Sequence, residues 1–538
     1  MSTEITSAAN EIHAATLTTA TSTKPERTRA GSGSRRERLF ALAPRQWPLA
    51  VALTVILGVQ GWNITNYPSL SDDEGTYLAQ AWAVRQGMGL SHYTFWYDHP
   101  PLAWIQIAAV SWLPELISPE GPAVAYGRLL MPVVTLSSAL LLYLLARRLA
   151  LPRWAAVLAV LLFGLSPISV SMHRQVYLDN IAVAWMLAAF VLALSPRRAF
   201  WVHVCAGLAG AVSVLSKETM ILVTPGLVIA LWQGSHPSTR KFSFVGFACS
   251  LVLISGLYPL YATLKGELFP GAGHVSLIGA SLYQLRDRTS SGSIFTVGSD
   301  ANDLLRSWLF HDTVLLVGGT LAVVLALAVP RLRAPALAGV VLVLVAMRPG
   351  GYLPAMYVIQ ALPFFALTLA GLAWVAVRML VCPPFKTLWR WIGLAGTVVA
   401  ALLATAAVVP RWIDGNHRAL TASETSSYAE AAAWIRGNVT HPADTRIVVD
   451  NVLWLDLAIA GFEPGRGAIW FFKLDLDPAI VLPGGWRDLD YVVSSPVVRR
   501  DAERLPLVAA ALANSEVVAS FGSGDGRIDI RRVNQSKE

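Results

Sequence analysis

The residues best suited to chemistry lie between the first two long apolar segments of the chain. Asp72, Asp73 and Glu74 form an acidic triplet there, and Asp98 and His99 stand directly before two prolines. Carboxylates and imidazoles can donate and accept protons in group transfer. An acidic triplet can also begin a helix, where carboxylates complement the positive end of the helix dipole. Both roles are open from the residues alone.

Two short amphipathic stretches hold these groups. Residues 77–84 give a helix with an apolar face, too short to cross a membrane, and 102–117 form a second such stretch. Between them, residues 93–97 are rich in Tyr, Phe and Trp, as in the aromatic belts of membrane interfaces. We therefore expect two helices in the plane of the interface, which hold the acids and the imidazole at the level of lipid head groups.

Other charged residues recur at the ends of later apolar segments. Arg128 lies at the start of the second predicted span. Arg174 and Asp179 flank a very short turn between two later spans, and Lys217 lies in a second short turn. Cations fixed in a site of low dielectric stabilise a departing phosphate strongly. The alternative to a phosphate-binding role is that each long basic side chain simply extends from the span toward water.

Asp98 and His99 also suggest a metal site. Carboxylate and imidazole groups are suitable ligands for a divalent cation. The sequence predicts no other cofactor.

Composition indicates the elements that must position these residues. Of 538 residues, 54% are hydrophobic and 14% are charged, against about 25% charged in an average soluble domain. This excludes an ordinary soluble enzyme. Apolar runs long enough to cross a bilayer predict about eleven transmembrane helices. We expect them near 47–66, 121–146, 153–172, 178–195, 200–216, 218–233, 243–263, 311–330, 334–347, 352–377 and 391–410.

The basic residues predict the orientation. The net charge is +8, but the basic residues lie in the N-terminal tail and in short loops, so nucleic-acid binding is not expected. With residues 1–46 as a disordered cytoplasmic tail, every inside loop is basic, as the positive-inside rule requires. The loops 67–120 and 264–310 and all residues after Pro410 then lie outside.

The chain changes character after the last apolar segment. A helical pattern near 424–439 is followed by short β-rich runs such as TRIVVD, DYVVSS, EVVASF and IDIRRV. We predict an all-α polytopic membrane domain over 47–410 and a small extracytoplasmic α/β domain over 411–538.

One combination of motifs resembles a known family. An Asp-Glu pair soon after the first span, followed by a His-Pro-Pro-Leu element in the same loop, resembles the GT-C superfamily of membrane glycosyltransferases. The similarity is to the protein O-mannosyltransferase and lipid A aminoarabinose transferase branch, and it covers roughly residues 47–380. It implies a polyprenyl or dolichyl phosphate sugar as donor and a site at the outer membrane face.

The resemblance also implies roles for residues. Asp73 is the expected catalytic base, with Glu74 beside it and Asp72 as the competing assignment. Some relatives have Lys where this chain has His99, and a metal lies near that element; the His favours the mannosyltransferase side, which does not need the metal. The cations expected to hold the donor phosphate are Arg128, Arg174 and Lys217, and the supporting residues are His99, Asp179, Arg348 and Tyr352.

These expectations combine into one hypothesis. The chain is predicted to be an inverting glycosyltransferase of the plasma membrane that moves a mannose-like sugar or a pentose from a polyprenyl-phosphate carrier to an acceptor hydroxyl. The acceptor could be a glycan, a lipid or a protein. The alternative is a transporter or flippase, but the charges cluster at one surface and no internal repeat is evident, unlike in many transporters.

Overall fold

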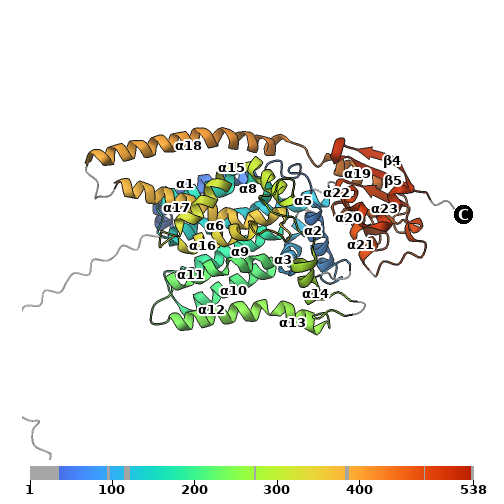
Figure 1. Cartoon of the computed structure of the whole chain (residues 1–538), viewed down its shortest axis with the longest axis horizontal. Helices are drawn as coiled ribbons and strands as arrows, with labels where there is room; N and C mark the ends of the chain where they lie inside the picture. Colours follow the sequence, from blue (N-terminus) through green and yellow to red (C-terminus); the bar gives the residue numbers. More distant parts are fainter. Residues whose placement is uncertain are drawn as a thin grey trace, which may run out of the picture. The chain divides into compact units, whose positions relative to one another are not determined.

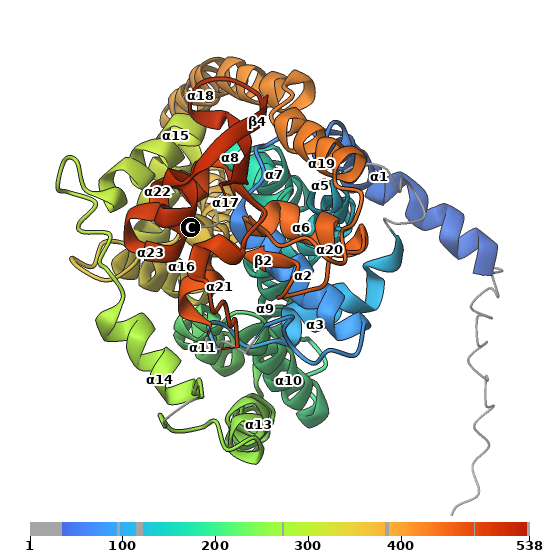
Figure 2. The same cartoon turned by 90° about the vertical axis from the view of Figure 1, so that its right-hand side faces the viewer.

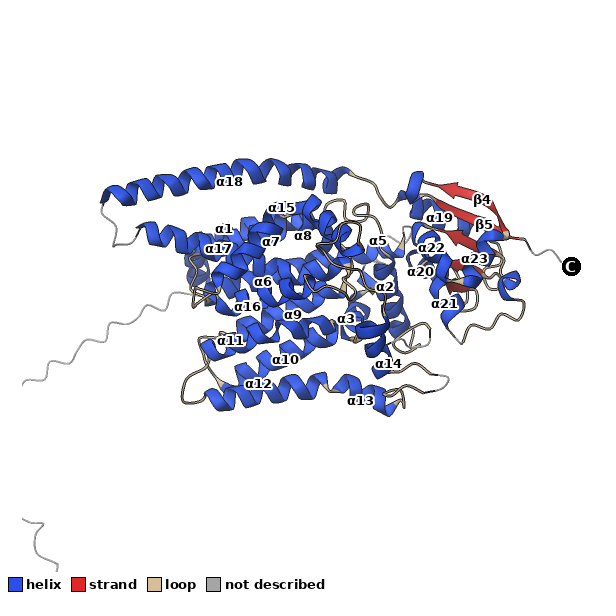
Figure 3. Cartoon of the chain, in the orientation of Figure 1, coloured by secondary structure: helices blue, strands red, loops and turns tan. Residues whose placement is uncertain are grey.

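The computed structural model describes residues 35–93, 97–113, 122–271, 274–381, 387–477 and 479–534. Residues up to Pro48 form a unit of their own, and the description below concerns the unit that begins at Leu49. Helices dominate this unit, and the strands gather in one small sheet near the C-terminus (Figures 1 and 3). Most of the predicted tail, residues 1–34, lies outside the described residues.

The part of this unit up to Thr421 is mostly helical, and its first helix begins before Leu49. The first group of helices is α1 (Arg35–Gly61), α2 (Asp72–Arg85), α3 (Leu102–Val110), α5 (Ala123–Gly127), the 3₁₀ turn η1 (Arg128–Leu130), α6 (Met131–Arg148), α7 (Arg153–Leu165), α8 (Pro167–His173) and α9 (Leu178–Ala193). The second group is α10 (Phe200–Ser216), η2 (Glu218–Val223), α11 (Thr224–Gly234), α12 (Arg240–Ser255), α13 (Leu257–Leu264), α14 (Leu277–Leu282) and the π-helical turn η3 (Tyr283–Asp287). The third is α15 (Asp300–Ala326), α16 (Arg333–Ala346), η4 (Ala355–Tyr357), α17 (Val358–Val381) and α18 (Thr387–Thr421).

Each of the predicted spans coincides with an apolar helix. Five helical stretches among the described residues are long and apolar enough to cross a membrane, and the pair α7–α8, bent by 62°, makes a sixth if it counts as one span. The remaining predicted spans correspond to shorter apolar helices of 10–17 residues. The fold is therefore that of a mostly helical chain with several candidate spans, and the number eleven stays a prediction.

Two of these helices are interrupted at polar residues that contact each other. Helix α15 starts at Asp300, before the predicted span 311–330, because its first turns are polar and not part of an apolar run. It leaves helical geometry at Asp312 (φ −156°, ψ 92°). Ser166, at the bend between α7 and α8, donates from its hydroxyl to the Asp312 carboxylate at 2.5 Å. The hydrogen bond satisfies both buried side chains at the point where each helix breaks.

The C-terminal part builds a five-stranded sheet with the order β2-β1-β3-β5-β4. Strand β1 pairs in parallel with β2 and β3, and β5 pairs antiparallel with β3 and β4. Four of the five strands were predicted from the sequence; the short β2 was not. The elements are α19 (Ser426–Asn438), β1 (Ile447–Val449), α20 (Asn451–Ile459), β2 (Ala468–Trp470), α21 (Phe471–Leu476), η5 (Gly485–Asp488), β3 (Tyr491–Ser494), α22 (Pro496–Asp501), η6 (Ala502–Arg504), α23 (Pro506–Ala513), β4 (Ser515–Phe521), η7 (Gly524–Gly526) and β5 (Ile528–Val533).

Alternation along the strands places helices on both faces of this sheet. Ile447 and Val449 of β1 pack in the same core as residues of α19 and α20. Val448, between them, packs in a second core with residues of α21 and α23. Since successive strand residues point to opposite faces, both faces are covered.

The two short amphipathic helices pack into the fold, and their position in the plane of a membrane interface stays a prediction. Most residues of α2 are buried, because it packs against both α3 and α20 (Figure 2). Helix α3 ends at Val110 and also buries its central residues. The predicted second stretch to residue 117 extends past the described residues, since 114–121 are not described. Both helices are internal parts of the fold.

Close helix packing gives a test of the fold. A Cβ atom on Gly207 of α10 would lie 2.3 Å from the backbone oxygen of Phe247 in α12, whereas one on Gly58 of α1 would have nothing within 4 Å. We expect Gly207→Ala to lower the melting temperature of the purified protein, at a cost of about 1 to 3 kcal/mol from overpacking. Gly58→Ala is the matched control and should leave the melting temperature unchanged or raise it. Equal melting temperatures for the two variants would contradict the close packing of α10 on α12.

Candidate active site

The acidic triplet forms the first turn of helix α2, and its three side chains have different surroundings. Successive residues of a helix point about 100° apart. Asp72, Asp73 and Glu74 therefore project from three sides of α2.

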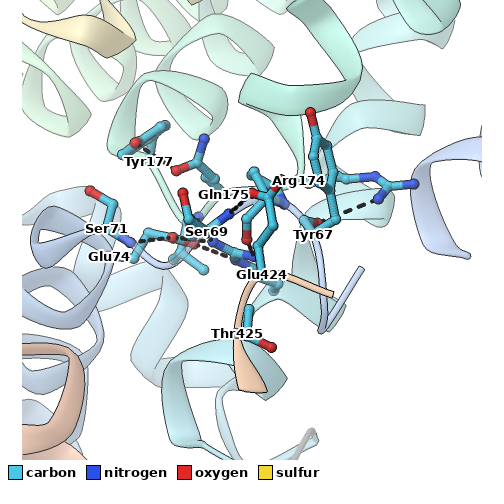
Figure 4. A network of polar contacts seen from close by, with 12 residues as sticks. Tyr67, Ser69, Ser71, Glu74, Arg174, Gln175, Tyr177, Glu424 and Thr425 are labelled. Carbon is cyan, nitrogen blue, oxygen red and sulfur yellow. Dashed lines mark hydrogen bonds and ion pairs between the residues drawn. The ribbon is translucent and has the colours of Figure 1, made fainter. Parts of the chain in front are cut away.

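Glu74 holds the start of α2 in place. Its side chain is fully buried and accepts from Arg128 twice, at 2.8 and 2.6 Å, and from the backbone N–H of Val176 at 2.9 Å. It also accepts from the backbone N–H of Ser71 at 3.1 Å, as an N-terminal capping residue does (Figure 4). Both oxygens are occupied by parts of the protein, so Glu74 is a structural residue. This corrects its predicted catalytic role.

Arg128 and Arg174 are not available to a donor phosphate, contrary to the sequence prediction. Arg128 is fully buried and, besides Glu74, donates to the backbone oxygens of Pro68 and Ser69 at 2.6 and 3.0 Å. Arg174 is also fully buried and donates to the backbone oxygens of Tyr67, Ala419, Val59 and Trp62 (Figure 4 shows its surroundings). Both guanidinium groups hold the chain segment between α1 and α2.

Asp72 turns toward the C-terminal part of the chain. Its Oδ1 accepts from the backbone N–H of Asn451, the first residue of α20, at 2.9 Å. Burial, and next the nearby Asp450, raise the pKa of Asp72 well above its usual value. This contact makes Asp72 a poor candidate for the competing assignment as base.

Asp73 is the member of the triplet whose charge is influenced by Lys217 and His99. Its side chain is exposed to solvent, but the surrounding protein desolvates it and raises its pKa, while Lys217 and His99 oppose part of this increase. Asp98 and Arg288 also act on its charge. Water can reach this carboxylate, although protein flanks it on most sides. A raised pKa suits a general base, because the proton affinity comes closer to that of the group it must deprotonate.

His99 and Lys217 are in direct contact beside Asp73. The Lys217 Nζ lies 2.9 Å from His99 Nε2, and His99 Nδ1 lies 3.1 Å from an oxygen of Glu218. Donation by Lys217 requires a lone pair on Nε2, so the proton of a neutral His99 lies on Nδ1 and is donated to Glu218. The backbone oxygen of His99 accepts from the Tyr258 hydroxyl at 3.1 Å. Lys217 and Glu218 thus hold the ring of His99, and Tyr258 holds its backbone.

Lys217 is buried at the break between α10 and η2. Its backbone is extended (φ −155°, ψ 115°), and its Nζ reaches His99. Burial alone would lower the pKa of Lys217, but the carboxylates of Glu218 and Asp179 raise it overall. Lys217 is therefore a cation in a largely dehydrated position, where a charge interacts strongly with an anion.

Asp179 lies in a buried polar layer with Gln360. Gln360 Nε2 donates to Asp179 Oδ1 at 2.7 Å and approaches Thr219 Oγ1 at 2.6 Å. Both Asp179 and Gln360 are fully buried, which matches a counterion of Lys217 better than a group that touches substrate. The supporting role of Asp179 stays a prediction.

The segment 264–310, which is predicted to lie outside, contacts the site through η3. Gln284 donates to Asp98, and Arg288 donates to Gln284 Oε1 at 2.6 Å. The guanidinium carbon of Arg288 lies 3.4 Å from the centre of the Tyr352 ring, in a cation–π contact. Tyr352 thus contacts Arg288, and its supporting role stays a prediction. Arg348 is exposed, and its Nε donates to Gly350 within its own turn, so no described contact joins it to the site.

Sequence reasoning did not assign Glu218, Gln360 or Arg288 to the site. A polar Gln in a predicted span was an available signal, since polar residues in spans are costly and often functional. Glu218 was recognisable only as the neighbour of Lys217. Arg288 lies far along the chain, and only tertiary structure brings it to Tyr352.

The residues present do not fit the predicted metal site. Both ring nitrogens of His99 have partners, and a lysine ammonium 2.9 Å from Nε2 repels a second cation there. Asp98 Oδ2 lies 3.6 Å from the same nitrogen, and Asp98 also accepts from Gln284. Among the described residues, no group of three His, Cys, Asp or Glu side chains could hold a metal ion. We derive no step through a metal.

Comparisons with known proteins find similar sequences. Residues 98–258 match the family model described as dolichyl-phosphate-mannose-protein mannosyltransferase. The lipid A galacturonosyltransferase RgtD of Rhizobium johnstonii is 29% identical over 182 residues, which make up 33% of this chain and 36% of that protein. The match thus spans little more than a third of the curated relative.

Solved structures match over nearly the whole chain. The crystal structure of ArnT from Cupriavidus metallidurans bound to undecaprenyl phosphate has a TM-score of 0.57 and 17% identity, and the match covers 92% of this chain and 99% of that one. This chain therefore shares its fold with that structure. The archaeal oligosaccharyltransferase AglB from Archaeoglobus fulgidus, in complex with an inhibitory peptide and a dolichol-phosphate, has a TM-score of 0.52 and 12% identity, with 94% of this chain and 75% of that one covered.

The GT-C resemblance drawn from the sequence is therefore confirmed. The family-model match includes the segment with Asp98 and His99 and the later turn with Lys217. The matched range does not include α2. The assignment of Asp73 to the site therefore rests on the geometry around this residue.

The structural role of Glu74 can be tested by stability. Because Glu74→Ala leaves Arg128 buried without its counterion, we expect a loss of about 3 to 5 kcal/mol and a clear fall in melting temperature. Arg348→Ala removes an exposed arginine and should leave the melting temperature unchanged, which makes it the control. A Glu74→Ala protein that is inactive but melts like the parent would instead indicate a role in chemistry.

Proposed function

We propose that the chain is an inverting glycosyltransferase that moves a sugar from a polyprenyl-phosphate carrier to an acceptor hydroxyl. The observation that carries the proposal is the pairing of Asp73, a solvent-accessible carboxylate with a raised pKa, with Lys217, a buried cation. A single displacement needs one base and one stabilised leaving group. These two residues supply both.

The proposed reaction is one substitution at the anomeric carbon. Asp73 takes the proton of the acceptor hydroxyl as the acceptor oxygen forms a bond to that carbon. The bond from the anomeric carbon to the carrier phosphate breaks, and its electron pair leaves with the phosphate oxygen. Lys217 and Arg288 stabilise the negative charge that develops there. Inversion follows because attack and departure occur on opposite sides of the carbon.

The assignment of cations differs from the expectation drawn from the sequence. Arg128 and Arg174 are bound to the protein itself, so Lys217 and Arg288 take the phosphate role in the proposal. Arg288 stacks one face of its guanidinium group on Tyr352 and donates from Nη1 to Gln284. Its N–H donors lie in the guanidinium plane, a geometry suited to an anion at the edge of the group.

The carrier is proposed by its chemistry and by similarity. Undecaprenyl phosphate and dolichol-phosphate are bound in the structures of ArnT and AglB that share the fold. We extend this to a polyprenyl-phosphate sugar as donor, with a mannose-like sugar or a pentose transferred, and with a glycan, lipid or protein hydroxyl as acceptor. We propose a plasma-membrane location with residues 1–46 in the cytoplasm, the membrane domain over 47–410, and the site and residues 411–538 outside.

Removal of the base tests the proposal directly. Membranes that contain the protein are supplied with radiolabelled undecaprenyl phosphate mannose and undecaprenyl phosphate arabinose, and the label that leaves the carrier is measured. We expect Asp73→Asn to reduce transfer by at least about 100-fold, because general-base catalysis contributes roughly 10²- to 10⁴-fold. Binding of undecaprenyl phosphate should remain nearly unchanged. Turnover retained in the purified variant would exclude Asp73 as the base.

The raised pKa of Asp73 predicts a pH dependence. The base acts when deprotonated, so kcat/KM should fall as the pH falls through the pKa of Asp73. Since desolvation raises that pKa, the fall should occur at higher pH than for an ordinary aspartate, whose pKa is about 3.9. The measurement is kcat/KM against pH with the labelled donor. A profile that stays flat down to pH 4 would contradict the assignment.

A further inference from the structure

The C-terminal α/β part of the chain touches the helix that carries Asp73. Asp450 caps the start of α20 by accepting from the backbone N–H of Leu453 at 3.1 Å. The next residue, Asn451, donates from its backbone N–H to Asp72 Oδ1 at 2.9 Å. Its side-chain amide donates to the Thr76 hydroxyl at 2.6 Å, and this hydroxyl donates to the backbone oxygen of Asp72 at 3.0 Å. The start of α20 is thus hydrogen-bonded to the first turn of α2.

The two helices approach so closely that only glycine fits between them. A Cβ atom on Gly75 would lie 2.2 Å from the backbone oxygen of Asn451, a distance that real atoms do not adopt. At the other end of the contact, the rings of Trp82 and Trp454 meet edge to face with centroids 5.7 Å apart. The contact therefore extends along both helices (Figure 2).

This contact determines how α2 is rotated about its axis. At about 100° per residue, Asp72, Gly75, Thr76 and Trp82 share one side of the helix. Asp73 projects about 100° away from Asp72, on the side that carries Tyr77, whose ring centroid lies 6.1 Å from that of His99. A rotation of α2 would carry Asp73 away from the cations that act on it.

We propose that α20 positions the catalytic base: its N-terminal turn holds Asp72 and Thr76 so that Asp73 faces Lys217. The proposal rests on the proposed function for the assignment of Asp73 as base. Asp72, Gly75, Thr76 and Asn451 are positioning residues in it, and the C-terminal part of the chain becomes a component of the active site instead of a separate binding module.

The character of Asp72 supports this role. Its carboxyl is surrounded by protein, with Asp450 nearby, and its contact with α20 uses a single oxygen that accepts a hydrogen bond. An amide at this position keeps an oxygen acceptor of the same size. Asp72→Asn should therefore preserve the contact, whereas Asp72→Ala removes it.

The backbone donor can be removed without breaking α20. Asn451 is the first helical residue, a position where proline is well accommodated, and Asp450 before it has φ −75° and ψ 169°, which suits a residue before proline. Asn451→Pro removes the backbone N–H that donates a hydrogen bond to Asp72. Asn451→Ala keeps this N–H and removes only the side-chain amide. Comparison of the two variants isolates the backbone hydrogen bond.

The test uses the full-length protein in nanodiscs, with undecaprenyl phosphate mannose and undecaprenyl phosphate arabinose as donors. We expect Asn451→Pro and Asp72→Ala to lower kcat by about tenfold or more, since small misplacements of a reacting group can cost up to about 100-fold. The donor KM and the binding of undecaprenyl phosphate should change by less than about twofold. Asn451→Ala should have a smaller effect, and Asp72→Asn should restore most of kcat relative to Asp72→Ala. Glu516→Ala, an exposed residue of β4, is the control on the same part of the chain.

Hydrogen exchange of the amides in residues 72–85 gives a second measurement that does not depend on activity. Faster exchange in Asn451→Pro than in Glu516→Ala supports the contact, and equal exchange overturns the proposal. The proposal is also overturned if Asp72→Ala retains the full kcat of the parent protein. It is likewise overturned if kcat falls as far in Asp72→Asn as in Asp73→Asn. If the parent protein transfers neither sugar while exchange responds as expected, the proposed donors fail and the contact between α20 and α2 stands.

Discussion

The buried ion pair between Glu74 and Arg128 is the interaction on which the rest of the site depends. Both side chains are completely excluded from solvent, and each would be costly to bury alone. The pair is stable because further hydrogen bonds satisfy the remaining polar atoms: Val176 and Ser71 donate to Glu74, and Pro68 and Ser69 accept from Arg128. One ion pair thereby links the start of α2, the chain before it, the turn after α8 and the beginning of η1.

This fixed point explains how adjacent acids can have different roles. Once Glu74 is held, the helical geometry of α2 leaves Asp72 and Asp73 little freedom in direction. Asp72 accepts a hydrogen bond from α20 on one side of α2. On another side, the charges of Lys217 and His99 act on Asp73. The structure thus separates the three carboxylates in function, although they are equivalent in the sequence.

The fold was largely predictable because its signals are local. Apolar runs identified the helices, and alternating residues identified four of the five strands. The site was predictable only in part. Asp73, His99, Lys217 and Tyr352 do come together, but Arg128 and Arg174 turned out to hold backbone oxygens. A sequence shows that an arginine lies near a helix end; whether its donors face a carbonyl or an open site depends on how distant segments pack. The same limit applies to Glu74 and to Arg288, whose partners are far away in the sequence.

The charges around Lys217 bear on the order of events in the proposed reaction. Glu218 and Asp179 keep Lys217 protonated despite its burial, so a cation is in place before any anion arrives. The same carboxylates repel a phosphate, and the repulsion depends on its charge. A sugar-phosphate diester carries one negative charge, whereas the phosphate monoester left after transfer carries up to two near neutral pH. The surrounding carboxylates therefore disfavour the spent carrier more than the donor. The carboxylates that keep the lysine charged for the transfer thus also offset part of the attraction that Lys217 and Arg288 exert on the spent carrier.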